Sequence, residues 1–443
     1  MTNLIETAPP IDLAIHDIEH LVEELRAYHA IDSSLWQRRE QREAAPTSLQ
    51  GLLAPLPRKS IEPIVLAVEG VAPKAVRAMQ SFISEGRWND ERLVHQHWQA
   101  VEMDLGADEG VLRVDGSDFP QQGRHSAGVK RPYCGELGMR AHCQAGVLVG
   151  YVSPQGDTWL DRRWSVPVEW LTDEAYAERR RPWGIPTAIT LKTKPALAQE
   201  RLAAIVQTRS LRCRWVVADE AFGCDTGFLE GVAGLGLWSV ADVPHSTRVW
   251  AERPVIHVPP WHGRGRRPQR ERLGVGAPEA RTVVEVAAAL PAAAWTHQTM
   301  QEGSQGPMVA EFARLRMVAV RDAWPGPDVW LVRRRHLETG ELKTYLGNAP
   351  VDIPVETGVR MSGMRWPIET CVEDSKPWLG MGDDEIRRWT GWHHQMTLVI
   401  LAHFFVVRMS LRLTKSPSGD VAPGGYGLGN GLTHTRVRPA VRA

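Results

Sequence analysis

Three residues late in the chain carry the charges needed to hold a phosphate beside a metal ion. In MRWPIETCVEDSK (residues 364–376), Glu369 lies four residues after Arg365 and seven before Lys376. On a helix these spacings place a cation, an anion and a cation along one stripe. The stripe could be exposed ion pairing, which contributes only weakly to stability. It could also be a metal-binding carboxylate flanked by two phosphate-binding cations.

Two aspartates earlier in the chain each end a short apolar run. Asp115 ends VLRVD (111–115) and Asp219 ends WVVAD (215–219). If both converge with Glu369, the three carboxylates can hold two divalent cations about 3.5–4 Å apart, the arrangement used for phosphodiester chemistry. Hard oxygen ligands favour Mg²⁺ or Mn²⁺. An acid at the end of a strand is also common without any metal, so spacing alone leaves both interpretations open.

The surrounding pattern indicates how these acids are positioned. Strand-like runs at 111–115, 145–154 and 158–167 precede a helical stretch at 196–210 and the run at 215–219. This is the order of a ribonuclease H-like α/β core, in which the first and fourth strands end side by side. Residues 11–105 show helical periodicity. Further β-like runs between Asp219 and Glu369, at 281–290, 313–320 and 328–335, predict a β-rich insertion.

We therefore expect an α/β protein built as a ribonuclease H-like catalytic core with a β-rich insertion and a helical N-terminal domain. The expected divisions are a helical domain for DNA binding or dimerisation, the first part of the core, the β-rich insertion, the returning core helices with Glu369, and a Gly- and Pro-rich disordered tail. These cover residues 1–108, 109–224, 225–360, 361–413 and 414–443. A bundle that only supports its neighbour remains an alternative for the first of them.

Several blocks of sequence resemble cut-and-paste transposases that use a DDE triad. Residues 362–376 match the signature Y-x-x-R-x-x-x-E-x-x-x-x-x-x-K except at its first position. VDGSDFPQQGRHSAGVKRPYCGELG (114–138), VVADEAFG (216–223), YLGNAP (345–350) and RKSIEPIVLAVEG (58–70) are similar to blocks of the insertion sequence 701 type, a relative of the insertion sequence 4 superfamily. The resemblance runs from about residue 15 to 410.

The resemblance implies that Asp115, Asp219 and Glu369 are the catalytic, metal-binding triad, with two Mg²⁺ or Mn²⁺ ions per site. It also implies that Arg365 and Lys376 contact DNA phosphates. The implied activity is metal-dependent cleavage at the ends of an element, followed by transfer of the 3′-hydroxyl into target DNA. The implied partners are double-stranded terminal inverted repeats, target DNA and further copies of the chain as a homodimer or larger assembly.

The chain departs from the family pattern at a few positions. Ser362 replaces the signature tyrosine, and Gly116 follows Asp115 where relatives often have a second acid. Asp118 is therefore held as a reserve for Asp115. Glu373 lies one helical turn after Glu369, but only Glu369 has the arginine and the lysine at both required spacings.

Other basic residues are candidates for DNA contact. WHGRGRRPQRER (261–272) predicts a basic loop that grips the DNA backbone through Arg264, Arg266 and Arg267, although a solvated surface loop remains possible. Arg124 and Lys130, just after Asp115, are placed to steer a strand into the site. His16 and His20 have the spacing of a zinc pair but no further ligand nearby.

Composition sets the remaining expectations. The formal net charge is +0, so contact with nucleic acid must be local. The five cysteines form no C-x-x-C pair, which argues for reduced thiols and against zinc held by cysteines. No signal peptide is apparent, and the apolar run at 396–407 is too short to cross a bilayer. We expect a cytoplasmic, nucleoid-associated bacterial protein with no membrane partner.

Two other functions remain open on the sequence. A catalytically decayed or domesticated relative would bind DNA as a regulator without cutting it, and Ser362 and the unusual tail favour this alternative. A glycosidase would also use two carboxylates, but it needs no flanking cations. Dependence of activity on a divalent metal would separate a glycosidase from a transposase.

Overall fold

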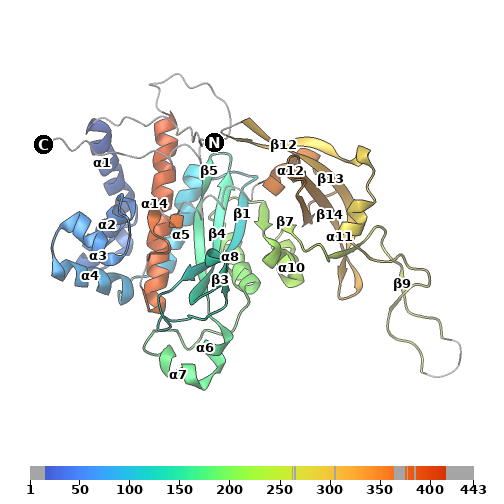
Figure 1. Ribbon diagram of the computed structural model, residues 1–443, viewed down its shortest axis with the longest axis horizontal. Helices are drawn as coiled ribbons and strands as arrows, with labels where there is room; N and C mark the ends of the chain where they lie inside the picture. The colour runs from blue at the N-terminus through green and yellow to red at the C-terminus, as the bar shows by residue number, and fades with distance from the viewer. Residues whose placement is uncertain are drawn as a thin grey trace. The chain divides into compact units, whose positions relative to one another are not determined.

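The computed structural model describes residues 15–261, 263, 266–303, 306–363, 375–376, 378–383 and 386–415 (Figure 1). The chain divides into two compact units. The first unit combines Met1–Arg214 with Trp366–Ala443, and the second is Trp215–Arg365. The mixed α/β architecture expected from the sequence, consistent with a ribonuclease H-like core, is confirmed. The finer division into five segments stays a prediction, and its tail lies almost wholly outside the described residues.

Helices fill the N-terminal part of the first unit, as the periodicity of residues 11–105 predicts. They are α1 (Ile15–Ile31), α2 (Arg39–Leu53), α3 (Ile61–Glu69), α4 (Pro73–Ser84) and α5 (Asp90–Leu105), with a short 3-10 turn η1 (Ser33–Leu35). Local chemistry explains where they begin. Pro73 opens α4 at a position that needs no backbone N–H donor. The side chain of Asn89 accepts a hydrogen bond from the backbone N–H of Arg92 and so caps α5.

An antiparallel meander forms the sheet of the first unit. Its strands are β1 (Val111–Pro120), β4 (Cys143–Ser153) and β5 (Gly156–Ser165). In the register of β1 and β4, Asp115 lies opposite Leu148. The turn predicted at 154–157 joins β4 to β5, and Gly156 adopts a positive φ there. Between β1 and β4 the chain forms β2 (Tyr133–Cys134), the 3-10 turn η2 (Gly135–Leu137) and β3 (Met139–Arg140).

Helices cover both faces of this sheet. On one face α5 and α14 (Trp389–Lys415) pack against β5, and the ring of Phe119 on β1 lies 5.9 Å from that of Trp392 on α14. On the other face lies α8 (Lys194–Thr208), whose Arg201 pairs with the buried Asp161 of β5 at 2.6 Å. Two short helices, α6 (Val168–Thr172) and α7 (Glu174–Arg180), connect β5 to α8. The sheet is therefore the middle layer of the unit.

Helix α14 is longer than its apolar sequence predicts. The run at 396–407 is too short to cross a bilayer, but the helix continues on both sides of it. By length and composition alone, Trp389–Arg412 could cross a membrane. In its most apolar part, 67% of this stretch is buried inside the protein. The helix packs against α2, α4, α5 and β5, so its apolar surface serves the core of the first unit.

The second unit is built on a mixed sheet. Strand β6 (Trp215–Ala218) runs parallel to β7 (Trp238–Asp242), with α9 (Glu220–Gly223) and α10 (Thr226–Gly234) in the crossover. Strand β15 (Leu342–Gly347) pairs with β7, and the order continues through β14, β13, β8 and β11. The remaining strands are β8 (Arg248–Trp250), β9 (Ile256–His257), β10 (Arg272–Leu273), β11 (Arg281–Thr282), β12 (Thr296–Gly303), β13 (Gly306–Arg321) and β14 (Trp324–His336). The predicted insertion strands thus extend the sheet that contains β6.

One predicted strand in this unit is wrong. Residues 281–290 form only the two-residue β11 and then α11 (Val283–Ala288). The hydroxyl of Thr282 accepts a hydrogen bond from the N–H of Glu285, and the Glu285 carboxylate accepts one from the N–H of Thr282. This capping box starts a helix and overrides the β-branched run that follows. The unit also contains η3 (Ala292–Ala294) and α12 (Val355–Gly363).

Candidate active site

Asp115 lies on the face of β1 that is covered by α14. Because side chains alternate along a strand, Asp115 shares its face with Arg113 and Phe119. The contact between the Phe119 and Trp392 rings fixes this as the α14 side. Gly146 on β4 and Trp164 on β5 lie on this same face of the sheet, and both are next to Trp392: a Cβ on Gly146 would touch Phe119 and Trp392, and the rings of Trp164 and Trp392 are 5.2 Å apart.

A buried arginine holds the carboxylate of Asp115. Nη2 of Arg113 lies 3.0 Å from Oδ2 of Asp115. The Arg113 side chain is 1% exposed, while that of Asp115 is 18% exposed. This ion pair offsets part of the cost of burying the guanidinium, because a buried charge without a counter-charge is strongly destabilising. Arg113 thus fixes the direction of the Asp115 carboxylate. Part of Asp115 still reaches solvent, so the carboxylate is accessible to a metal ion.

The reserve candidate Asp118 lies on the opposite face of the same strand. It shares that face with Gly116, where an added Cβ would lie 3.3 Å from Nζ of Lys194 at the start of α8. Lys194 Nζ is 3.9 Å from Oδ1 of Asp118, and Oδ2 accepts a hydrogen bond from the N–H of Gly135 at 3.0 Å. Asp115 and Asp118 therefore point away from each other and cannot exchange roles.

Lys376 lies on the same face of β1 as Asp115. Its Nζ is 5.9 Å from the centroid of the Phe119 ring and 3.4 Å from the backbone oxygen of Asp118. The ammonium also forms an ion pair with Glu136 in η2. The hydroxyl of the neighbouring Ser375 accepts a hydrogen bond from Nε1 of Trp159. A DNA phosphate at this position would compete with Glu136 for the lysine.

Lys59 anchors the chain just beyond Lys376 to the N-terminal helices. Its buried ammonium donates to the backbone oxygens of Leu52 and Trp378, and its backbone N–H donates to Oδ2 of Asp383 at 2.9 Å. Burial lowers the pKa of Lys59 to about 8. The block at 58–70 stands out in the sequence only because it resembles a block of the transposase family. The structure shows that its Lys59 tethers the segment that follows Lys376.

The other two members of the predicted triad are placed differently. Asp219 follows β6 and caps α9, with Oδ1 accepting hydrogen bonds from the N–H groups of Ala221 and Phe222. Asp219 belongs to the second unit and Asp115 to the first. Glu369 and Arg365 lie outside the described residues, as does Glu373. Convergence of the triad stays a prediction, and its donor set of carboxylate oxygens fits Mg²⁺ or Mn²⁺.

Most of the predicted DNA contacts that the structure describes are exposed. Arg124, Arg266 and Arg267 are exposed, and the half-exposed Lys130 forms a 2.5 Å ion pair with Glu169. Arg264 and the side chains of His16 and His20 lie outside the described residues. Ser362, at the signature tyrosine position, is 1% exposed and donates its hydroxyl hydrogen bond to the backbone oxygen of Val359. Ser362 is thus used internally in α12.

A basic cleft in the first unit was missed by the sequence reasoning. It has a volume of about 500 Å³ and is lined by the N-terminal helices and the turn before α14. Its cationic lining residues are Lys59, Arg77, Arg387 and Arg388. The available signal in the sequence was the adjacent pair Arg387 and Arg388, just before the long apolar run. The lining also contains Glu62 and Glu85, and Glu85 pairs with Arg388 at 3.4 Å, so the cleft carries both charges with cations in excess.

Comparison with known proteins identifies the family. The family model described as DDE superfamily endonuclease matches residues 23–307. This span contains Asp115 and Asp219 and ends before Glu369. A search of curated proteins finds no match. Because the model covers more than half of the chain, the protein belongs to the DDE superfamily endonucleases.

Proposed function

We propose that this endonuclease is a transposase of the insertion sequence 701 type, which cuts at the ends of its element and joins them to target DNA. The observation that carries the proposal is the shared face of β1. Asp115 and Lys376 lie there together, so a carboxylate suited to a metal ion and a cation suited to a phosphate occupy one side of the strand.

The chain's own residues would divide the work as follows. Asp115, Asp219 and Glu369 would hold two Mg²⁺ or Mn²⁺ ions. When bound, the ions supply activation of the attacking oxygen and stabilisation of the leaving oxygen. Arg113 orients the carboxylate of Asp115. Lys376 and Arg365 would hold the DNA backbone near the carboxylates, and such contacts position the strand without reading its sequence.

The proposed reaction has two steps at each end of the element. Water attacks a phosphorus atom and the bond to the 3′ oxygen breaks, which releases a 3′-hydroxyl. This hydroxyl then attacks a phosphorus atom of the target, and the target's own 3′ oxygen leaves. The nucleophiles are water and the DNA end, so no covalent link between protein and DNA forms. Binding of two ends implies a homodimer or larger assembly on double-stranded DNA, in the bacterial cytoplasm.

The test is metal-dependent nicking and strand joining on DNA that carries the element's own ends. Wild type is compared with Glu369→Gln and with Glu373→Gln, a matched control four residues further along the chain. We expect cleavage with Mg²⁺ or Mn²⁺ in wild type and Glu373→Gln, and its loss in Glu369→Gln. If Glu373→Gln is the inactive variant, the third carboxylate is misassigned by one turn.

A decayed, DNA-binding regulator is the second candidate function. Ser362 favours it, because the buried serine replaces a signature tyrosine and bonds within its own helix. The same assay separates the two functions. Wild type that binds the ends but cuts with neither metal would be the regulator.

A further inference from the structure

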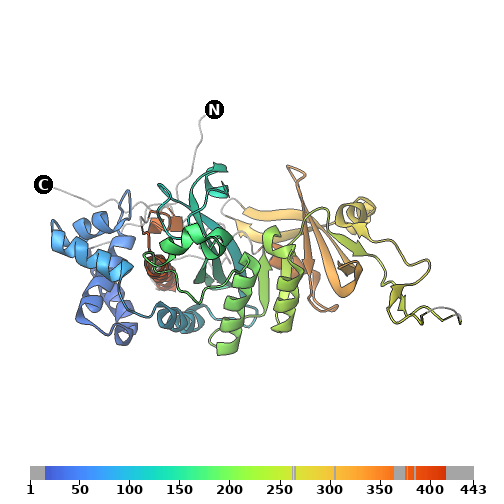
Figure 2. The same cartoon turned by 90° about the horizontal axis from the view of Figure 1, so that it is seen from below.

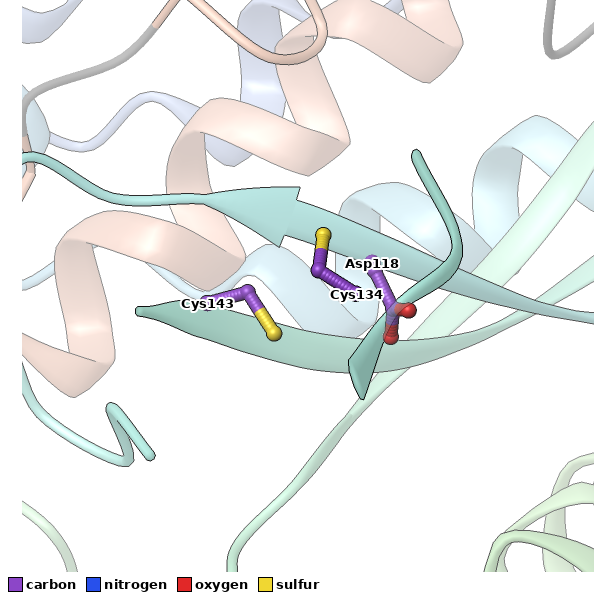
Figure 3. Close-up of side chains that lie close together, drawn as sticks. All are labelled: Asp118, Cys134 and Cys143. Atoms are coloured by element: carbon purple, nitrogen blue, oxygen red, sulfur yellow. The ribbon is translucent and has the colours of Figure 1, made fainter. Parts of the chain in front are cut away.

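Two buried cysteines and an aspartate lie together on the face of β1 opposite Asp115 (Figure 3). Cys134 comes from β2, Cys143 from the start of β4, and Asp118 from β1. One ligand atom from each, the two Sγ atoms and a carboxylate oxygen, all lie within 4.8 Å of one another. The cysteines are separated by eight residues in the chain, so no short cysteine motif announces the group.

The two thiols of this group are shielded from solvent. Cys134 is 0% exposed and Cys143 is 2% exposed. Metal binding would release both thiol protons, because thiolates bind metal ions after losing their protons. The positively charged Lys194, 3.9 Å from Asp118, partly offsets the negative charge of the ligands.

We propose that Cys134, Cys143 and Asp118 bind one zinc ion, with water at the fourth position. Two thiolates and a carboxylate are ligands that zinc accepts, and thiolates disfavour Mg²⁺. With Zn–S bonds of about 2.3 Å, ligand atoms at tetrahedral angles lie about 3.8 Å apart. The observed group therefore needs to contract by only about 1 Å to reach that geometry.

The surroundings of Asp118 support this assignment. Its Oδ2 accepts the hydrogen bond from Gly135, which fixes the direction of the carboxylate, and Oδ1, which lies 3.9 Å from Nζ of Lys194, would bind the ion. Gly135 directly follows Cys134, so one short segment supplies both a ligand and a support for another ligand. The site is built on β1 and β4, paired strands of the sheet's core.

The ion would act as a clamp beside the catalytic strand. It would join the turn at 134–137 to β1, and that turn carries Glu136, the partner of Lys376. The same connection between β1 and β4 contains Arg124 and Lys130, two of the predicted DNA contacts. Zinc would thus order the DNA-binding side of the site without taking part in the cleavage itself.

The test is the zinc content of the purified full-length protein, measured by elemental mass spectrometry after removal of loosely bound metal. We expect about one zinc per chain in wild type and in Cys224→Ser, an exposed control cysteine. Cys134→Ser and Cys143→Ser should each lose it, and Asp118→Asn should bind it more weakly. Zinc retained by both cysteine variants would overturn the proposal.

A second measurement needs no variant and so does not depend on folding. Wild type reconstituted with Co²⁺ should show a thiolate-to-metal absorption band, and zinc should protect Cys134 and Cys143 from alkylation until a strong chelator is added. A metal-free wild type after purification with added zinc would contradict the proposal. A Cys134–Cys143 disulfide, found by peptide mapping without reductant, would contradict it as well.

Discussion

Strand β1 carries an acid on each of its two faces, and the surroundings of the two acids differ in kind. Asp115 is partly open to solvent and lies on the same face of β1 as Arg113 and Lys376. Asp118 faces two buried thiols and Lys194. Three positions apart on a strand, the two carboxylates point to opposite sides. Proximity in a motif is therefore a poor guide to which acid does which chemistry.

The comparison suggests that one strand supports two separate functions. On the α14 face, fixed charges surround a carboxylate that can bind an exchangeable hard metal ion. On the α8 face, soft ligands would hold a structural ion. Altering the ligands on one face should leave the metal ion on the other face bound.

Removal of Mg²⁺ should have the largest effect. Without a divalent ion the carboxylate face cannot stabilise the reacting oxygens, so we expect cleavage to fall by about a thousandfold or more. The measurement is the single-turnover nicking rate of DNA carrying the element ends, before and after dialysis. Added Mg²⁺ should restore the rate at once. Recovery with added zinc alone would break the distinction between the two faces.

Acidification should destabilise the layer that covers the Asp115 face. His97 on α5 and His393 on α14 are buried and His403 on α14 is partly buried, and burial lowers their pKa values to about 4, 3 and 4, respectively. The unfolded chain binds protons below pH 6.5 while the folded chain does not, so the folded state loses stability as pH falls from 6.5 towards 4. Each histidine contributes about 1.4 kcal/mol per pH unit in this window.

The check on this pH effect is urea unfolding between pH 7 and 5. The free energy of unfolding should fall steadily, and His403→Gln should reduce its slope against pH. His245 in the second unit gives the control variant, because His245→Gln removes a histidine outside this layer. A slope unchanged by His403→Gln would contradict the account.

Loss of the Lys59 tether should cost stability in the first unit. Lys59→Met leaves two backbone oxygens, those of Leu52 and Trp378, without their donor. Each buried unsatisfied group costs about 1–3 kcal/mol, so for the two oxygens we expect the free energy of unfolding to fall by about 2–6 kcal/mol. The exposed Lys74→Met serves as the control in the same urea titration. Equal stability of the two variants would rule out the tether.

Substitution of Lys376 should have the smallest effect, a modest loss of affinity for DNA. Lys376→Met removes one phosphate contact, which we expect to weaken DNA binding about tenfold and to reduce the salt dependence by about one ion. Glu136→Gln should do the reverse, because it frees Lys376 from its ion pair. Binding is measured by fluorescence anisotropy over a salt series, with Lys192→Met as the control. Weaker binding by Glu136→Gln would contradict this role.

The strand order of the core could be predicted because apolar runs and turns are local signals. The meander of β1, β4 and β5 and the helix α8 lie close to their predicted positions. The strand predicted at 281–290 failed because the capping box of Thr282 and Glu285 outweighs β propensity. The length of α14 was underestimated, since a buried helix tolerates polar residues such as His393 within its apolar pattern.

The contacts of the candidate site were harder to predict from the sequence than the order of the strands. Motif spacing pointed to Asp115 and Lys376, but the pairing of Arg113 with Asp115 depends on the face of a strand. The grouping of Cys134 with Cys143 depends on how a connection folds back on β1, and spacing alone argued against cysteine-bound zinc. Contacts distant in sequence, such as Lys59 with Trp378, leave no local pattern at all.

The most direct test of the central claim compares Asp115→Asn with Asp118→Asn in one nicking assay with Mg²⁺. Asparagine keeps the size of each side chain but removes its charge and replaces one acceptor oxygen by an amide donor. Urea unfolding of both variants is measured alongside, because Asp115 pairs with the buried Arg113. The account predicts that Asp115→Asn loses about a thousandfold in cleavage rate, while Asp118→Asn stays within about tenfold of wild type. The reverse ranking, with Asp118→Asn inactive and Asp115→Asn active, would contradict the assignment of the catalytic face.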